Sequence, residues 1–108
     1  MPNGYVEKLT IESVVFRVPR EYAALVVYFD DYWGKKSNAE VWTISPTNPD
    51  VYEKQVATVP AIKKMLNGKE VYVSVFPRLE PGTYMVRIPG YHKKVTLFPG
   101  YISEVDFS

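Results

Sequence analysis

The feature that most constrains this chain is an alternation of side chains with a period of two, which recurs from residue 69 to the end. It runs through residues 71–76, 83–88 and 94–98. Successive side chains of a β-strand point to opposite faces, so this period is typical of strands with one face against a core and the other in water. The abundance of Val, Tyr, Phe, Ile and Thr favours the same structure. We therefore expect an all-β fold.

Three earlier segments are also predicted strands, at residues 8–18, 23–29 and 39–45. The second of these is apolar at every position, which predicts a central strand covered on both faces. The next segment, residues 52–65, contains Pro60, and proline in a strand indicates an edge or a bulge. A helical turn over residues 60–66 is the alternative there.

Regular turn signals separate these segments: Asn67-Gly68, Pro81-Gly82, Pro89-Gly90 and Pro99-Gly100. Asn-Gly is the preferred pair for a two-residue hairpin, and Pro-Gly pairs mark corners. Strands that recur about every 8–12 residues indicate a sandwich or barrel. The prediction is a single domain over residues 1–108, folded as an antiparallel Greek-key sandwich of seven or eight strands. A small closed barrel is the alternative.

Composition excludes several classes of protein. The net charge of +1 argues against a nucleic-acid binder that relies on bulk charge. The absence of cysteine excludes a disulfide scaffold, a thiolate zinc site and a thiol nucleophile. The longest apolar run, Tyr22 to Phe29, is far shorter than the roughly 20 residues of a transmembrane helix. The first ten residues hold no signal-peptide core, so a cytoplasmic location is expected if Met1 is the native start.

Part of the chain resembles a known group of folds. Residues 79–86 (Leu-Glu-Pro-Gly-Thr-Tyr-Met-Val), 95–97, Gly100 and 104–107 resemble the C-terminal half of transthyretin-like (prealbumin-like) sandwiches. These include carboxypeptidase regulatory-like domains and the B-type repeats of collagen-binding adhesins. The resemblance implies that Tyr84 and Val86 enter the core and that the last strand returns as an edge.

A second likeness covers residues 24–28, 39–46 and 71–77, which are similar to a small bacterial family often labelled "phospholipase". That label implies a hydrolase acting on lipid esters. Relatives in the family tend to carry a His-rich N-terminal stretch that this chain lacks, and we expect no metal and no cofactor. The family itself is uncharacterised, and its strand motifs say little about chemistry because one fold hosts many functions.

Catalytic candidates are few. His92 is the single histidine, and Ser103 with Asp106 would complete a Ser-His-acid arrangement. No Gly-x-Ser-x-Gly motif marks a nucleophile, so we expect an exposed His92 at the start of a strand and no enzymatic activity. The adjacent carboxylates Asp30 and Asp31 lack calcium-loop spacing, and the nearby pair Lys35-Lys36 would repel a cation. The lysine pairs at 35–36, 63–64 and 93–94 are expected to be solubilising charges if they are scattered, whereas pairs gathered at one end of the sandwich would suit anionic headgroups or phosphate.

Aromatic residues are unusually numerous, with nine Tyr, five Phe and two Trp making 15% of the chain. A candidate binding surface consists of Tyr32, Trp33, Trp42, Tyr91 and Tyr101. We predict a non-catalytic module that binds a protein partner or a second copy through an edge strand or an aromatic loop. The alternative is a carbohydrate-binding module in which coplanar aromatics stack on sugar rings. The high aromatic content also has a purely structural explanation, in which Trp42 and Tyr28 fill the core while loop aromatics cover its ends.

Overall fold

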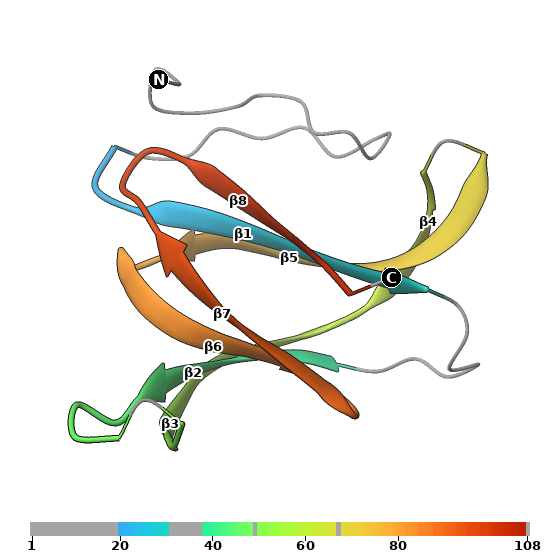
Figure 1. Cartoon of the computed structure of the whole chain (residues 1–108). Helices are drawn as coiled ribbons and strands as arrows, with labels where there is room; N and C mark the ends of the chain where they lie inside the picture. Colours follow the sequence, from blue (N-terminus) through green and yellow to red (C-terminus); the bar gives the residue numbers. More distant parts are fainter. Residues whose placement is uncertain (1–19, 31–37, 49, 67, 108) are drawn as a thin grey trace.

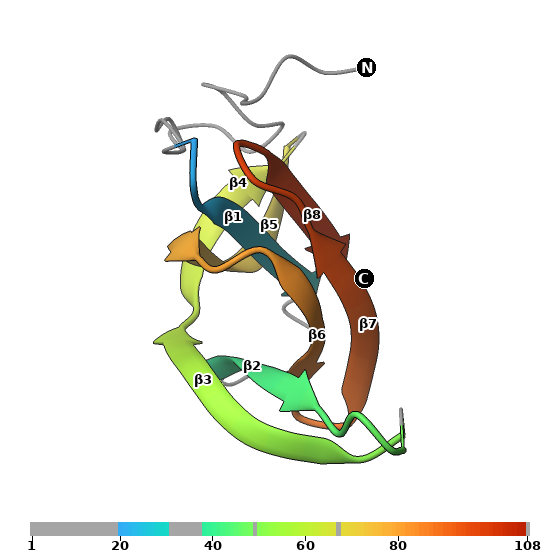
Figure 2. The same cartoon turned by 90° about the vertical axis from the view of Figure 1, so that its left-hand side faces the viewer.

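The chain forms two four-stranded β-sheets packed face to face (Figures 1 and 2). The computed structural model describes residues 20–30, 38–48, 50–66 and 68–107. Sheet 1 has the strand order β4-β5-β1-β8, with bounds Ile62–Leu66, Lys69–Leu79, Ala23–Asp30 and Ile102–Asp106. Sheet 2 has the order β3-β2-β6-β7, with bounds Tyr52–Pro60, Asn38–Ile44, Gly82–Ile88 and Tyr91–Leu97.

The chain passes from one sheet to the other between β1 and β2, β3 and β4, β5 and β6, and β7 and β8. Repeated crossing of this kind is how a sandwich connects its two layers. The predicted all-β sandwich is therefore confirmed, with eight strands and no helix in the parts of the chain that the structure describes. The arrangement is two separate sheets and not a closed barrel.

Strand β1 is buried on both faces, as its sequence predicts. All side chains from Ala23 to Phe29 are at most 8% exposed. Leu25, Val27 and Phe29 belong to the main core between the sheets, while Val26 and Tyr28 join a second apolar cluster on the opposite face of sheet 1. Hydrogen bonds to β5 on one side and to β8 on the other complete its backbone pairing.

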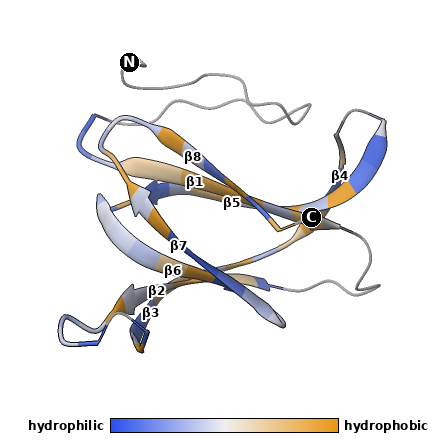
Figure 3. Cartoon of the chain, viewed as in Figure 1, coloured by the Kyte–Doolittle hydropathy of each residue, from blue (hydrophilic) through white to orange (hydrophobic). Residues whose placement is uncertain are grey.

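The main core is built by the alternating inward residues of both sheets. Sheet 2 contributes Val41, Val86 and Ile88, each at most 1% exposed. Burying one aliphatic side chain of this size contributes about 1.5–3 kcal/mol, so the core supplies most of the driving force for folding. Figure 3 shows β1 in hydrophobic colours along most of its length, whereas the first half of β7 is hydrophilic. As the resemblance implied, Tyr84 and Val86 lie in this core.

One pair of strands runs against the antiparallel prediction. Strand β8 is an edge of sheet 1, as expected, but it is parallel to β1, with Ala24 opposite Ile102 and Tyr28 opposite Asp106. The cause is the preceding strand, β7, which lies in sheet 2, so the chain crosses between the sheets before β8 begins. Alternation of side chains reports which face a residue occupies and carries no information about strand direction.

Pro60 ends β3, an edge strand of sheet 2, in agreement with the edge prediction. The segment predicted as one strand is in fact two, because the chain crosses at Ala61 and continues as β4 in sheet 1. The alternative helical turn is not formed. Near the crossing, the buried Ser74 hydroxyl donates to the Val59 carbonyl oxygen at 3.1 Å, which links the two sheets.

The hairpin turns follow the predicted glycines. Gly68, between β4 and β5, and Gly90, between β6 and β7, have φ of 81° and 85°. A side chain disfavours this left-handed backbone conformation, which explains glycine at both positions. The strand predicted at residues 8–18 lies outside the described residues, as do Asp31 and the pair at 35–36.

Tyr84 stabilises the corner between β5 and β6. Its hydroxyl donates a 2.7 Å hydrogen bond to the carbonyl oxygen of Glu80, four residues earlier, while its ring is only 9% exposed. Burial and the nearby Glu80 carboxylate raise the pKa of the Tyr84 phenol. The neutral hydroxyl is the form that donates this hydrogen bond. Burial and the Glu80 carboxylate both favour the neutral form, so both favour the hydrogen bond at this corner.

We expect Tyr84→Phe to lower the free energy of unfolding by about 1 kcal/mol, because the part-buried hydrogen bond between the Tyr84 hydroxyl and the Glu80 carbonyl oxygen is lost. Urea unfolding followed by circular dichroism measures the change. The control is Thr83→Val, which removes the exposed hydrogen bond between Thr83 and Thr96 and should cost under about 0.5 kcal/mol. Equal effects in the two variants would contradict a structural role for the Tyr84 hydroxyl.

Candidate functional site

The solvent-facing side of sheet 2 carries a group of aromatic and charged side chains. Val41 and Val86 face the core, so the residues beside them along β2 and β6 face outward. We call this group the outer-face cluster. It draws on all four strands of sheet 2 and consists of Glu40, Trp42, Tyr52, Met85, Arg87 and His92.

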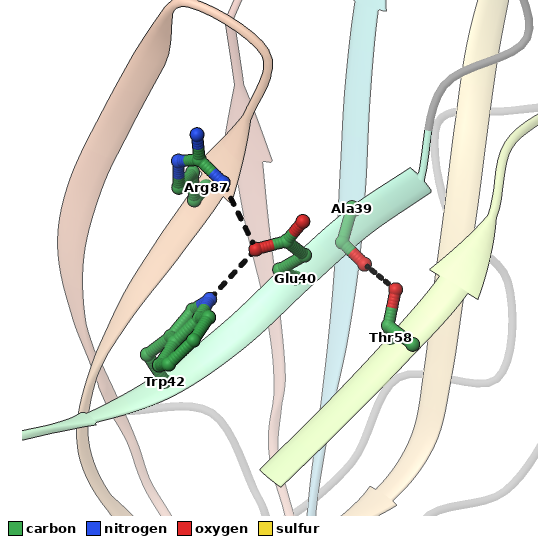
Figure 4. Close-up of polar contacts among 5 residues, drawn as sticks. All are labelled: Ala39, Glu40, Trp42, Thr58 and Arg87. Atoms are coloured by element: carbon green, nitrogen blue, oxygen red, sulfur yellow. Dashed lines mark hydrogen bonds and ion pairs between the residues drawn. The ribbon is translucent and has the colours of Figure 1, made fainter. Parts of the chain in front are cut away.

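Glu40 holds two neighbours through one oxygen (Figure 4). Its Oε1 accepts a 2.8 Å hydrogen bond from the Trp42 indole Nε1 and lies 3.1 Å from Arg87 Nη1. The Arg87 and Glu40 side chains are 44% and 25% exposed, and surface ion pairs of this kind contribute at most about 1 kcal/mol. The main consequence of the arrangement is therefore that it orients the indole and the guanidinium.

Three rings from three strands meet on this face. The Trp42 and Tyr52 ring centroids are 5.7 Å apart with planes tilted by 36°, and the Tyr52 ring contacts His92 edge-on at 5.9 Å. Beneath them, Met85 lies directly opposite Trp42 in the β2–β6 register and is only 6% exposed. Met85 is therefore covered by neighbouring side chains, although it lies on the side of the sheet that faces away from the core.

The Tyr52 hydroxyl shares this environment with charged groups. Burial raises the pKa of Tyr52, the nearby Arg87 guanidinium opposes that rise, and the Glu40 carboxylate adds to it. The net direction is upward, so the folded protein favours the neutral phenol. A neutral hydroxyl beside a carboxylate and a guanidinium can act as both hydrogen-bond donor and acceptor.

The structure separates the predicted aromatic residues. Trp42 is half-buried in the outer-face cluster, Tyr91 is 50% exposed at the start of β7, and Tyr101 lies at the β7–β8 corner against Phe98. Because β7 has seven residues and spans about 20 Å, Tyr91 and Tyr101 are at opposite ends of it. The remaining two, Tyr32 and Trp33, lie outside the described residues.

Sequence reasoning missed Tyr52, Met85, Arg87 and Glu40. The period of two within residues 39–45 contains a usable signal, since it places Glu40 on the same face as Trp42. The same reasoning applied to β6 groups Met85 with Arg87. Tyr52 gives no such signal, because its approach to His92 depends on how the whole sheet curves.

The Ser-His-acid candidates lie on different sheets. His92 is exposed on sheet 2 and packs against Tyr52, whereas Ser103 and Asp106 belong to β8 of sheet 1. Within the described ranges, no three His, Cys, Asp or Glu side chains are grouped so that they could hold a metal ion. The same ranges contain no helix that is long and apolar enough to cross a membrane.

The two lysine pairs that the structure describes occupy different strands. Lys63-Lys64 is on β4, where the Lys63 ammonium lies 5.7 Å from the Tyr72 ring centroid. Lys93-Lys94 is on β7, and Lys93 donates a 2.7 Å hydrogen bond to the Asp106 carbonyl oxygen while its ammonium lies over the Phe107 ring. Lys93 therefore ties the edge of sheet 2 to the end of β8.

Comparison with known proteins gives no relative to guide the interpretation. No family model, curated protein sequence or solved structure matches the chain. The assignment of a function therefore rests on the geometry of the sandwich and its outer-face cluster.

The raised pKa of Tyr52 predicts a specific alkaline instability. The unfolded phenol ionises near its ordinary value of 10.0 and the folded one at higher pH. Its contribution to stability is therefore complete below pH 10 and is lost as the pH rises through the folded pKa. We expect the unfolding free energy of Tyr52→Phe to fall less steeply than that of wild type as the pH rises above 10, as measured by urea unfolding. Parallel curves for the two proteins would show that the Tyr52 hydroxyl is not in this environment.

Proposed function

We propose that the protein is a non-catalytic binding module whose outer-face cluster engages a protein partner. The observation that carries this proposal is the half-buried Trp42, oriented by Glu40 on the side of sheet 2 that faces away from the core. A two-layer sandwich does not need large aromatic side chains there for its core. An aromatic group on a solvent-facing sheet is suited to burial against a second molecule.

The residue types support a protein partner. Trp, Tyr and Arg are the types that most often dominate the binding energy of protein interfaces, and Trp42, Tyr52 and Arg87 lie together in the cluster. Their contacts with Glu40 and with one another restrict their rotamers before binding. Side chains that are already ordered lose less conformational entropy when a partner arrives.

The geometry of the rings supports the carbohydrate-binding alternative less well than a protein partner. Stacking on a sugar favours aromatic rings that lie in one plane, whereas Trp42 and Tyr52 are tilted by 36° and Tyr52 meets His92 at 82°. A single sugar on Trp42 alone is compatible with the geometry. The hydrolase alternative has less support, since His92 makes its aromatic contact on a different sheet from Ser103 and Asp106.

Membership of the transthyretin-like group is likewise a proposal. It is supported by the edge position of the last strand and the inward Tyr84 and Val86. Immunoglobulin-type sandwiches are a second candidate, because they share two packed sheets with connections that cross between them and a tyrosine corner like that of Tyr84 with Glu80.

Site-specific photo-crosslinking in living cells tests the protein-binding function. A photo-crosslinking amino acid is placed at Lys94, which neighbours Met85 in the β6–β7 register, or at Arg78 on sheet 1 as the control position. We expect a discrete protein adduct from position 94 and none from position 78. Adding Trp42→Ala should reduce the adduct at least about tenfold, as loss of an interface hot spot does.

Absence of an adduct from position 94, or one that persists with Trp42→Ala, would contradict the proposed role of the cluster. A glycan array probed with wild type and with Trp42→Ala distinguishes the carbohydrate-binding alternative from the protein-binding function. Selective binding of a glycan by wild type alone would favour the carbohydrate-binding function.

A further inference from the structure

The solvent-facing side of sheet 2 carries more positive than negative charge. The outward residues of β2, β6 and β7 include two cations, Arg87 and Lys94, and one carboxylate, Glu40. The edge strand β3 adds one charge of each sign, Glu53 and Lys54. A surface with an excess of positive charge favours a partner with complementary negative charge.

The strand register places Lys94 beside the outer-face cluster. Trp42 lies opposite Met85 across β2–β6, and Met85 lies opposite Lys94 across β6–β7. Directly opposite residues of adjacent strands share a face, so these three form one row across the sheet. Two strand spacings separate the Cα atoms of Trp42 and Lys94 by about 10 Å. The row joins an aromatic, an apolar and a cationic side chain, and Arg87 lies two residues from Met85 on the same face.

Arg87 is held on one side and open on the other. Its Nη1 contacts Glu40 Oε1 at 3.1 Å (Figure 4), whereas its Nε–Nη2 edge makes no hydrogen bond to a residue that the structure describes. That edge presents two parallel N–H donors, which match the two oxygens of a carboxylate. The Arg87 side chain is 44% exposed, so a partner can reach it. Glu40 therefore orients the guanidinium without occupying the edge that suits an anion.

The Lys94 ammonium is exposed, and within the described parts of the chain it has no hydrogen bond, ion pair or ring contact. Its neighbour Lys93 differs, because it contacts the Asp106 carbonyl oxygen and the Phe107 ring. Lys94 is diagonal to Arg87 across β6–β7, and like charges at such positions repel each other. An anion bound near both side chains would remove this repulsion.

We propose that the partner of the outer-face cluster is an acidic protein segment. An aspartate or glutamate carboxylate of the segment binds the Nε–Nη2 edge of Arg87 within reach of Lys94, and an adjacent apolar side chain packs on Trp42. This inference rests on the proposed protein-binding function and specifies the chemistry of the partner. Charge-assisted, bidentate hydrogen bonds to arginine fix the position of a carboxylate, while the aromatic contact supplies apolar burial.

A basic partner is less favourable on the same face. The one carboxylate available to it, Glu40, already accepts hydrogen bonds from Trp42 and Arg87 through Oε1 and is only 25% exposed. A lysine or arginine that approached Glu40 would also meet the positive charges of Arg87 and Lys94. Both effects lower the affinity for a cation and leave the affinity for an anion intact.

Selection from a phage library of random peptides tests the proposal. Wild-type protein is used for the selection, and the selected peptides are then titrated against the protein in solution. We expect enrichment of Asp or Glu next to an aromatic or aliphatic residue. The affinity should weaken as the salt concentration rises, and it should fall at least about tenfold with Trp42→Ala.

Charge variants locate the carboxylate. Arg87→Lys keeps the charge but removes the two-donor edge, so it should weaken binding about tenfold. Lys94→Gln should weaken it about threefold, because Arg87 still holds the carboxylate, and Lys94→Glu should weaken it more. An uncharged crosslinking residue at position 94 is expected to have the same small effect as Gln and to remain able to capture the partner.

Matched controls are Arg20→Lys before β1 and Lys64→Glu on β4, which make the same changes away from sheet 2 and should leave affinity unchanged. Circular dichroism verifies that each variant is folded. Replacing the acidic residue of a selected peptide by its amide should cost about tenfold against wild type and much less against Arg87→Lys, because that variant has already lost the interaction.

Selected peptides that require Trp42 but show no preference for acidic residues would overturn the acidic partner and leave the protein-binding function standing. Peptides enriched in Lys or Arg would also overturn it and would identify Glu40 as the charged contact. Selection of no peptide, or binding of sulfated heparin in place of acidic peptides, would overturn it as well. The photo-crosslinking experiment at position 94 decides the protein-binding function separately.

Discussion

The rest of the structure depends on the burial of β1. Seven consecutive residues, Ala23 to Phe29, have side chains that are nearly inaccessible to water, on both faces of the strand. Such a strand is stable only in the interior of a sheet with apolar groups above and below it. This constraint places β5 and β8 beside it and makes sheet 1 apolar on two sides. The outward face of sheet 2, by contrast, carries the aromatic and charged side chains of the outer-face cluster.

The local features of the fold are readable from the sequence because their causes are local. Period-two alternation identified β5 through β7, and the apolar run of residues 23–29 gave β1 its central position. Glycine at 68 and 90 marked turns because the backbone there has positive φ. The parallel direction of β8 and the change of sheet at Ala61 were not predictable in this way. Both are decided by pairing between strands distant in the sequence.

The same distinction applies to the candidate site. Trp42 was identified by its residue type. The alternation of side chains along residues 39–45 also predicts that Glu40 lies on the same face as Trp42. Tyr52 joins the cluster through contacts of its ring with Trp42 on the neighbouring strand and with His92 on the opposite edge strand of sheet 2, and the second contact depends on how the whole sheet curves. The predicted grouping of Trp42 with Tyr91 and Tyr101 considered residue type and exposure alone, whereas the sheet places the two tyrosines at opposite ends of β7.

The most direct test of this account is disulfide cross-linking of β1 to β8, which a chain without cysteine allows cleanly. Ala24 lies opposite Ile102 in the parallel register, at the spacing of adjacent strands of about 4.8 Å, which suits a disulfide. The pair Ala24→Cys with Ile102→Cys should therefore oxidise to an intramolecular disulfide in the folded protein. The pair Ala24→Cys with Asp106→Cys, about 13 Å apart along the strand, should not. Cross-linking of the second pair and not the first would show that β8 runs antiparallel to β1 and would contradict the architecture.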